Sequence, residues 1–404
     1  MSFDDSNVCY YVTVLLPFAM GVLIPWCLFK AFRTNTKVIV SSLAEIQHIL
    51  NPASATIEYL VGSRARSNTR LVRAFHLTNT FVSIDTEVHR AFVREAKRLI
   101  PLKGFGFPFG GLAAQITAEL GRSICSKPSK VDFDYAKFIQ ILTFKVMIST
   151  LFKVDLDSMD TDDVVFVTTG INTLWNLSKT TANFPPGLLE GINRRVSYWI
   201  TDIENPLNLI IPVYETMWQV VAIGVVLLHH DPRACRLLET YLQNPTPEQF
   251  ARWEGSEASV QSLISETLRL YPPVRRISRI ISTRPAWVPS CLDSYFQQSV
   301  SADISILQRD MTIWGQDANA FDASRHYPSK LTQEQASTLL AFSAGRIKCV
   351  ASSWAPQAAS LLIAAMVKKV NEEGLEGIDI KEGSKLGSRD GWGGWKVISR
   401  HSHH

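Results

Sequence analysis

The residues most clearly suited to catalysis or metal binding lie in one short segment, residues 342–349, whose sequence is FSAGRIKC. Gly345 allows a tight turn shortly before Cys349, and the apolar run at residues 350–370 predicts a helix that begins directly after the cysteine. The N-terminus of such a helix favours negative charge and helps to keep the sulfur as a thiolate. A thiolate in this setting can ligate a haem iron and favour cleavage of an O–O bond. The alternative interpretation is a buried free cysteine that opens an ordinary core helix.

An acid and an alcohol, Glu215 and Thr216, stand in the middle of a long apolar run at residues 206–228. A helix that is apolar on all sides is either buried or spans a membrane. Because a carboxylate near the centre of a bilayer is costly, the run predicts a helix through a protein core. There the pair either makes structural hydrogen bonds or delivers protons. Pro212 lies in the same run and can bend this helix.

A second polar pair, Glu266 and Arg269, lies three residues apart in a predicted helix at residues 258–270. This spacing places both side chains on one face, where they can pair with each other and with a third group. On an exposed surface such pairs are common and contribute little to stability.

In chain order, these three motifs resemble those of the cytochromes P450, whose cysteine loop reads Phe, two residues, Gly, three residues, Cys. The irregular segment at residues 314–326 is similar to the family's segment between the Glu-x-x-Arg helix and the cysteine loop. The resemblance implies that Arg325, in this segment, is the third partner of Glu266 and Arg269. It covers residues 37–400, most clearly from residue 210 onward, and it implies a mainly α fold with a minor β portion.

The same resemblance implies that Cys349 is the axial ligand of the iron in haem b, and that Phe342 and Gly345 belong to the cofactor-binding loop. Ile347 stands where the family usually has an arginine or histidine that binds a haem propionate. That link must then come from elsewhere.

Four basic residues are candidates to replace the missing propionate ligand. Two lie on the extended stretch after a proline-rich turn, and two lie on a basic helix predicted at residues 88–100. They are Arg276, Arg279, His89 and Arg94.

The function that the resemblance implies is a monooxygenase that inserts one oxygen atom from O2 into a lipophilic small molecule, in secondary metabolism. Glu215 and Thr216 would relay protons, and electrons would come from NADPH through a membrane-bound flavoprotein reductase that docks beside Arg346 and Lys348. Two alternatives stay open. One is a haem-thiolate enzyme that rearranges or dehydrates its substrate, and the other is a truncated, non-catalytic, membrane-anchored helical protein.

Composition and charge limit the classes of molecule that the protein is expected to bind. The chain has 404 residues and a net charge of +4 with no dense basic block, which argues against nucleic acid. Its 6 cysteines show no CxxC or zinc spacing and predict no disulfide framework.

Residues 9–29 are almost wholly apolar, with acidic residues before them and basic residues after them, and predict a transmembrane helix. We therefore expect an anchor at residues 1–36 and one cytosolic catalytic domain at residues 37–404, on the endoplasmic reticulum membrane as the resemblance implies.

Hydrophobic periodicity places these motifs mostly on helices. Residues 37–50 predict a strand, a serine cap and a helix, followed by a polar loop through residue 70. An extended segment is expected at residues 274–281, and residues 303–314 are expected to be extended or irregular. Further helices are predicted at residues 88–100, 113–124, 135–152, 160–176, 188–200, 206–228, 232–244 and 258–270.

Overall fold

The structure is a computed structural model that describes residues 37–100, 133–284, 296–372, 377–384 and 391–399, together with single positions between these ranges. The predicted membrane anchor at residues 9–29 and most of the predicted helix at residues 113–124 lie outside the described residues.

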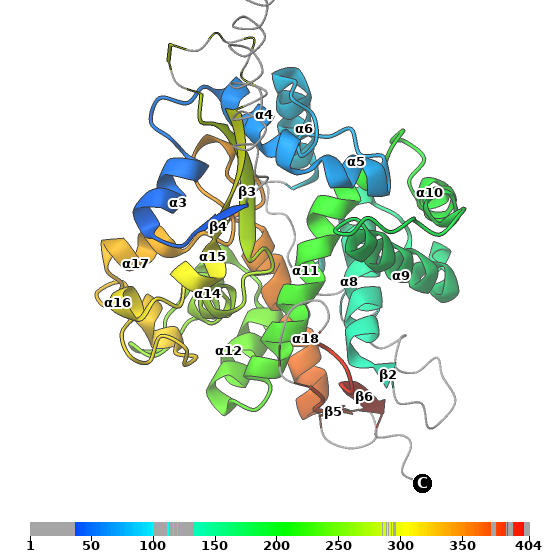
Figure 1. Ribbon diagram of the computed structural model, residues 1–404. Helices are drawn as coiled ribbons and strands as arrows, with labels where there is room; N and C mark the ends of the chain where they lie inside the picture. Colours follow the sequence, from blue (N-terminus) through cyan, green and yellow to red (C-terminus); the bar gives the residue numbers. More distant parts are fainter. Residues whose placement is uncertain are drawn as a thin grey trace, which may run out of the picture.

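Three apolar helices form the centre of the molecule. Helix α11 (Leu207–Leu228) packs against α8 (Tyr135–Phe152) on one side and α18 (Ala355–Asn371) on another (Figure 1). Helices α8 and α11 are long and apolar enough to cross a bilayer, but 83% of α8 and 78% of the most apolar window of α11 are buried inside the protein. Both are therefore core helices here, as predicted for the run that carries Glu215 and Thr216.

Further helices surround this centre, and most agree with their predicted ranges. Helices α9, α12 and α14 begin at a side chain that accepts a backbone N–H, namely Asp160, Asp231 and Ser259. The remaining helices of this part are α9 (Thr161–Leu177), α10 (Leu188–Trp199), α12 (Pro232–Gln243), α13 (Pro247–Ala251), α14 (Val260–Leu270) and α17 (Gln333–Thr338), with 3-10 turns η2 (Leu156–Ser158), η4 (Ala323–His326) and η5 (Gly345–Ile347).

The N-terminal part of the described chain contains more helix than predicted. The strand β1 (Val38–Val40) and the helix α3 (Leu43–Leu50), capped by Ser42, confirm the prediction for residues 37–50. The predicted polar loop through residue 70 is wrong, because α4 (Ile57–Ser67) and α5 (Thr69–Phe75) occupy it before α6 (Thr86–Leu99). Thr56 caps α4, and the polar residues Ser63 and Arg64 are buried in it, so the helix lacks the apolar periodicity that would have revealed it.

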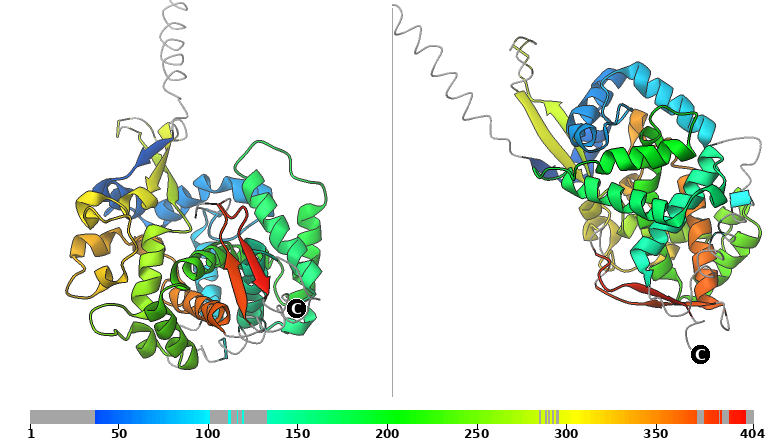
Figure 2. Two further views of the ribbon diagram at one scale, coloured as in Figure 1. Left: turned by 90° about the horizontal axis from the view of Figure 1, so that it is seen from below. Right: turned by 90° about the vertical axis from the view of Figure 1, so that its right-hand side faces the viewer.

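Two small sheets lie on different sides of the helical body (Figures 1 and 2). In the larger one, β4 (Gln297–Asp303) pairs with β1 in parallel and with β3 (Arg276–Ser282) in antiparallel fashion. The smaller has the order β2 (Phe133–Asp134), β6 (Lys396–Ser399), β5 (Ile378–Lys381). The fold is thus mainly α with a minor β portion, as predicted.

Residues 303–314, predicted to be extended or irregular, contain two short helices. The strand ends at Asp303, whose carboxylate accepts the Ile306 N–H at 3.1 Å and caps the short helix α15 (Ile304–Leu307), and α16 (Met311–Trp314) follows. The predicted strand at residues 274–281 is confirmed as β3.

Candidate functional site

A largely apolar cavity of about 380 Å³ lies where α6, α11, β3 and the cysteine loop meet. Cys349, Glu215 and Thr216 all line it, although they come from segments more than 130 positions apart. A pocket of this size and character is suited to a small organic molecule or a cofactor. Its apolar lining includes Phe92, Leu99, Ile211, Val213, Met217 and Leu268.

The cysteine loop is a tight turn rather than the start of a helix. The Cys349 N–H donates to the Phe342 carbonyl at 3.0 Å, and both Ser343 and Gly345 have positive φ angles, of 61° and 70°. A Cβ on Gly345 would lie 2.3 Å from the side chain of Asn51, so glycine is required there by φ and by space. Phe342 lines the cavity but Gly345 does not, which makes Gly345 a residue that shapes the loop.

The predicted helix directly after Cys349 is wrong, because α18 begins only at Ala355. Although Cys349 has accessible surface, that surface faces the cavity, and the surrounding protein still desolvates the sulfur. Burial raises the pKa of the Cys349 thiol, and a backbone hydrogen bond from Ala351 and the charge of Lys348 oppose this only in part. The loop by itself therefore does not hold the sulfur as a thiolate. A metal ion that binds the sulfur would deprotonate it.

The acid and the alcohol of α11 face the same cavity. Glu215 is almost fully buried and Thr216 is partly buried. The helix continues through Pro212, which has no N–H to offer to the carbonyl of Asn208. The Asn79 side chain donates to that carbonyl at 2.6 Å, so the bond lost to proline is replaced from outside the helix.

Strand β3 contributes two of the predicted basic residues to the cavity. Arg279 is 4% exposed and donates to the Ser278 carbonyl at 2.9 Å, while its Nε has no hydrogen-bond partner among the described residues. Burial, followed by the charge of Arg64, lowers the pKa of Arg279 to about 10. Arg276 also lines the cavity, but it is half exposed and its Nε lies 2.6 Å from the Asp303 carboxylate. The positive charge of Arg276 is therefore balanced by Asp303, whereas Arg279 has no carboxylate partner among the described residues.

Helix α6 supplies one of its two predicted residues and not the other. His89 lines the cavity, and its Nδ1 lies 2.8 Å from the Thr80 hydroxyl. Burial, followed by the charges of Arg64 and Arg90, lowers the pKa of His89. Arg94 is exposed and does not line the cavity, and its role as a propionate ligand stays a prediction. The basic face of this helix points mostly to solvent.

Arg64, on α4, is a site residue that sequence reasoning missed. It is buried, lines the cavity and donates to the Thr80 carbonyl at 2.8 Å and to the Thr80 hydroxyl. Burial lowers the pKa of Arg64 to about 10. The available signal was an arginine placed shortly after Leu60 and Val61, in a segment that begins with a threonine cap.

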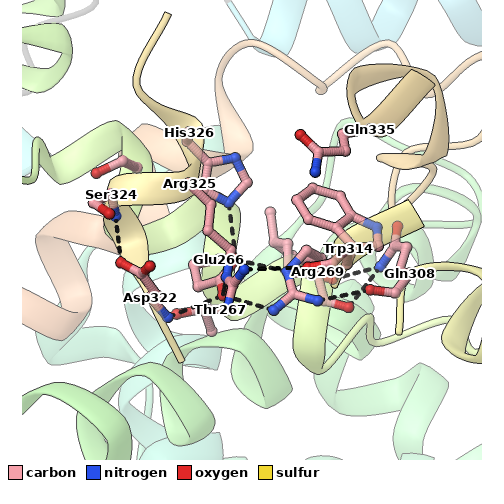
Figure 3. A network of polar contacts seen from close by, with 12 residues as sticks. Glu266, Thr267, Arg269, Gln308, Trp314, Asp322, Ser324, Arg325, His326 and Gln335 are labelled. Atoms are coloured by element: carbon pink, nitrogen blue, oxygen red, sulfur yellow. Dashed lines mark hydrogen bonds and ion pairs between the residues drawn. The ribbon is translucent and has the colours of Figure 1, made fainter. Parts of the chain in front are cut away.

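Glu266 and Arg269 form a fully buried ion pair away from the cavity (Figure 3). Two hydrogen bonds of 2.7 Å join the guanidinium to the carboxylate. The predicted third partner, Arg325, lies 3.7 Å from the Glu266 carboxylate, but its closest ion pair is with Asp317 at 2.5 Å. His326, which was not predicted, lies 2.9 Å from the carboxylate instead.

This ion pair connects α14 to the irregular segment that follows α15. Arg269 also donates to the carbonyls of Gln308 and Ala318, at 2.8 Å and 2.7 Å. Burial raises the pKa of Glu266, but hydrogen bonds from Arg269 and His326, the charge of Arg269 and the Asp322 N–H outweigh it and lower the pKa to about 2. The carboxylate is therefore ionised, and the cluster holds structure together without facing the cavity.

The fold and the cavity define a class of protein: a mainly helical domain in which a cysteine loop, an acid–alcohol pair and buried arginines share one apolar site. Residues 259–381 match the family model of cytochrome P450, a range that contains Glu266, Arg269, Arg325 and Cys349. The chain is therefore similar to the cytochrome P450 family over this range, and that family implies a haem cofactor.

Three curated relatives agree with this similarity. The chain is 31% identical over 172 residues to cytochrome P450 monooxygenase FSL4 of Gibberella zeae, covering 38% of this chain and 30% of the relative. It is 28% identical over 129 residues to cytokinin hydroxylase of Arabidopsis thaliana, covering 31% and 23%. It is 31% identical over 113 residues to cytochrome P450 72A13 of the same plant, covering 28% and 22%. The alignments thus span less than a third of each relative.

Proposed function

We propose that this protein is a haem-thiolate monooxygenase that inserts one oxygen atom from O2 into a lipophilic small molecule. The observation that carries the proposal is that Cys349, Glu215 and Thr216 line one largely apolar cavity. A sulfur donor, an acid–alcohol pair and a dry, apolar space are the three things that the chain must supply for this chemistry.

The residues of the cavity fit a haem. Cys349 offers the sulfur ligand. The buried guanidinium groups of Arg64 and Arg279 each have an Nε without a hydrogen-bond partner among the described residues, which suits the carboxylates of the cofactor. When bound, the haem would supply the oxygen chemistry, and the electron density of its thiolate ligand favours O–O cleavage. Burial raises the pKa of the Cys349 thiol, so deprotonation would accompany metal binding.

The other residues position the substrate and move protons. The apolar walls would bind a lipophilic molecule and exclude water from the reaction. The Thr216 hydroxyl would hold a proton at the cavity surface, and the Glu215 carboxyl beside it would replenish that proton. Both roles require a position at the cavity, which both residues have.

Electrons and location complete the proposal. Arg346 and Lys348 are exposed beside the cysteine and offer a basic surface to an acidic, membrane-bound flavoprotein reductase that uses NADPH. The apolar run at residues 9–29 would anchor the catalytic domain to the cytosolic side of the endoplasmic reticulum membrane. The apolar lining of the cavity supports a role in secondary metabolism.

The test is the carbon monoxide difference spectrum of the dithionite-reduced protein, recorded for the wild type, Cys349→Ser and Cys235→Ser. Cys235 is the matched control, because it lies outside the cavity and its thiol lies near the carbonyls of Leu228 and His229. We expect a strongly red-shifted Soret band in the wild type and in Cys235→Ser, and its loss in Cys349→Ser. A histidine-like band in the wild type would contradict thiolate ligation, and well-folded protein without a haem signal would overturn the enzyme proposal.

A further inference from the structure

Helix α11 contains a proline one turn before the acid–alcohol pair. Pro212 has no N–H, so the Asn208 carbonyl loses the bond that the helix would otherwise give it. Thr216 follows Pro212 by four residues, and both line the cavity. In an α-helix the N–H of Thr216 points to the Pro212 carbonyl, so the position of this turn sets the position of the Thr216 backbone. The turn with the missing bond therefore supports the acid–alcohol pair.

Asn79 replaces the missing bond from outside the helix. Asn79 is 4% exposed, and its side-chain nitrogen donates to the Asn208 carbonyl at 2.6 Å. The side-chain oxygen accepts the Phe81 N–H at 3.0 Å, and this bond fixes which end of the amide faces α11. Asn79 does not line the cavity, whereas its neighbour Thr80 does. Asn79 can therefore influence the cavity only through the elements that it contacts.

Further hydrogen bonds hold the Asn79 amide in its place. The Thr78 N–H donates to the Asn208 side-chain oxygen, and the Asn208 side-chain nitrogen donates to the Thr78 hydroxyl, each at 2.9 Å. The Asn79 carbonyl accepts the N–H groups of Val82 and Ser83, so its backbone is held in a turn. These bonds keep the Asn79 amide opposite the Asn208 carbonyl.

We infer that Asn79 is a positioning residue for the acid–alcohol pair: its amide replaces the hydrogen bond that Pro212 removes and so keeps Glu215 and Thr216 in place at the cavity. This inference rests on the proposed function, which assigns proton transfer to the pair. Without the Asn79 donor, the Asn208 carbonyl would be left without a partner, and the turn before the pair would be free to shift. A shift of about 1 Å in the groups of a site can reduce its activity about a hundredfold, so a support outside the cavity can matter as much as a residue within it.

The test compares Asn79→Ala and Asn79→Asp with the wild type in two measurements on the full chain. The carboxylate in Asn79→Asp can accept the Phe81 N–H but has no N–H for Asn208, so it removes only the bond to α11 and keeps the test decisive if Asn79→Ala folds poorly. Hydrogen exchange of peptides that span residues 207–217 should become about tenfold faster in both variants. The infrared stretch of carbon monoxide on the dithionite-reduced haem protein responds to polar groups around the bound gas, and it should shift from its wild-type frequency.

Pro212→Ala restores the missing N–H within the helix and so provides a rescue. The double variant Asn79→Ala with Pro212→Ala should exchange as slowly as Pro212→Ala alone and share its carbon monoxide frequency. The matched control is Asn205→Ala, which removes a 3.3 Å bond to the His76 carbonyl and leaves the Asn208 carbonyl with its donor. This control should behave as the wild type does.

Two results would overturn the inference. One is wild-type exchange and an unchanged carbon monoxide frequency in Asn79→Asp, and the other is a double variant that stays as altered as Asn79→Ala. In both cases a red-shifted Soret band in every variant would leave the proposed function standing. A wild-type protein without that band would overturn the proposed function and, with it, the role of the pair that Asn79 positions.

Discussion

At the scale of single residues, Glu266 shows how much one buried carboxylate can hold together. It accepts hydrogen bonds from Arg269 and from the Asp322 N–H and lies against His326, with no exposed surface. Replacement by Gln would leave the Arg269 guanidinium buried without its counter-charge. We expect Glu266→Gln to lower the free energy of unfolding by about 3–5 kcal/mol in urea titrations.

The exposed pair of Arg233 and Glu257 provides the control for this measurement. The Nη1 atom of Arg233 lies 2.8 Å from the Oε2 atom of Glu257, but the two side chains are 47% and 60% exposed. Glu257→Gln should therefore change the free energy of unfolding by no more than about 1 kcal/mol. Equal effects of the two substitutions would contradict the assignment of Glu266 as the organising residue of the cluster.

The lowered pKa of Glu266 also predicts how stability depends on pH. Its pKa in the folded protein is about 2, against an ordinary value of 4.5. A group whose pKa is depressed by folding stabilises the fold fully above the unfolded-state value and loses this contribution as pH falls towards the folded value. The difference in unfolding free energy between wild type and Glu266→Gln should thus shrink as pH falls from about 4.5 to about 2. A difference that is constant over this range would count against the ionised, hydrogen-bonded carboxylate.

Thr216 is the residue whose hydroxyl the proposed chemistry needs. If it passes protons at the cavity, Thr216→Ala should reduce product formation, measured per NADPH consumed, by about a hundredfold, which is a modest effect for general acid catalysis. Thr216→Ser keeps a hydroxyl at the same position and should retain most of the yield. A Thr216→Ala protein that forms product as the wild type does would favour a haem-thiolate reaction without oxygen activation.

The neighbouring residues Arg325 and His326 show one limit of prediction from the sequence. The resemblance placed Arg325 as the third partner of Glu266, yet His326 lies closer to the carboxylate and Arg325 turns to Asp317. Both residues belong to the short 3-10 turn η4. Spacing along the chain locates this turn near α14, but which of two neighbouring cations faces the acid depends on the local backbone, which the sequence pattern does not specify.

At the scale of elements, the contact between α11 and α18 depends on Gly224. A Cβ on this residue would lie 2.4 Å from Cδ1 and 3.0 Å from Cγ1 of Ile363 on α18. We expect Gly224→Ala to destabilise the fold by about 1–3 kcal/mol through overpacking, in spite of the better helix propensity of alanine.

A double-mutant cycle can assign this effect to the helix contact. Ile363→Val removes the Cδ1 atom that the new methyl group would meet, so the combination of Gly224→Ala with Ile363→Val should be less destabilised than the sum of the two single variants. Strict additivity in urea unfolding would show that the two helices do not meet at these residues as described.

The elements that sequence analysis identified share one property, a long apolar or clearly capped pattern. Helices α8 and α11 are apolar runs, and α12 and α14 begin at Asp231 and Ser259, so their ranges could be predicted closely. Helix α4 was missed because its buried face includes Gly62, Ser63 and Arg64, which read as polar loop residues. These residues are buried because α4 packs against β3, α6 and η5. The local pattern of apolar residues does not reveal such tertiary packing.

At the scale of the whole molecule, the cavity is made of parts that lie far apart in the sequence. Cys349, Glu266 and Arg269 fall within the region that matches the family, whereas Glu215, Thr216 and Arg64 precede it. The cysteine and the acid–alcohol pair could be predicted because each has a local motif. The contribution of Arg64 could not, because it depends on how α4 packs against β3 and the cysteine loop.

Because elements from distant parts of the chain line this cavity, we expect a bound cofactor to stabilise the entire fold. Haem would contact the cysteine loop, β3, α4, α6 and α11 at once, and a ligand that binds only the folded state stabilises it by mass action. At a haemin concentration of about 100 times Kd, the gain should be about 2.7 kcal/mol, and it should grow with the logarithm of the haemin concentration.

Thermal unfolding followed by circular dichroism, with increasing haemin, measures this gain as a rise in Tm. The rise should be smaller for Cys349→Ser at the same haemin concentration, because a serine would bind the iron more weakly and raise Kd. It should be unchanged for Cys235→Ser, whose thiol does not line the cavity. Haemin that binds to the molecular surface would raise Tm equally in all three proteins, or in none. That result would mean that the cavity does not receive the cofactor, whatever the motifs along the chain suggest.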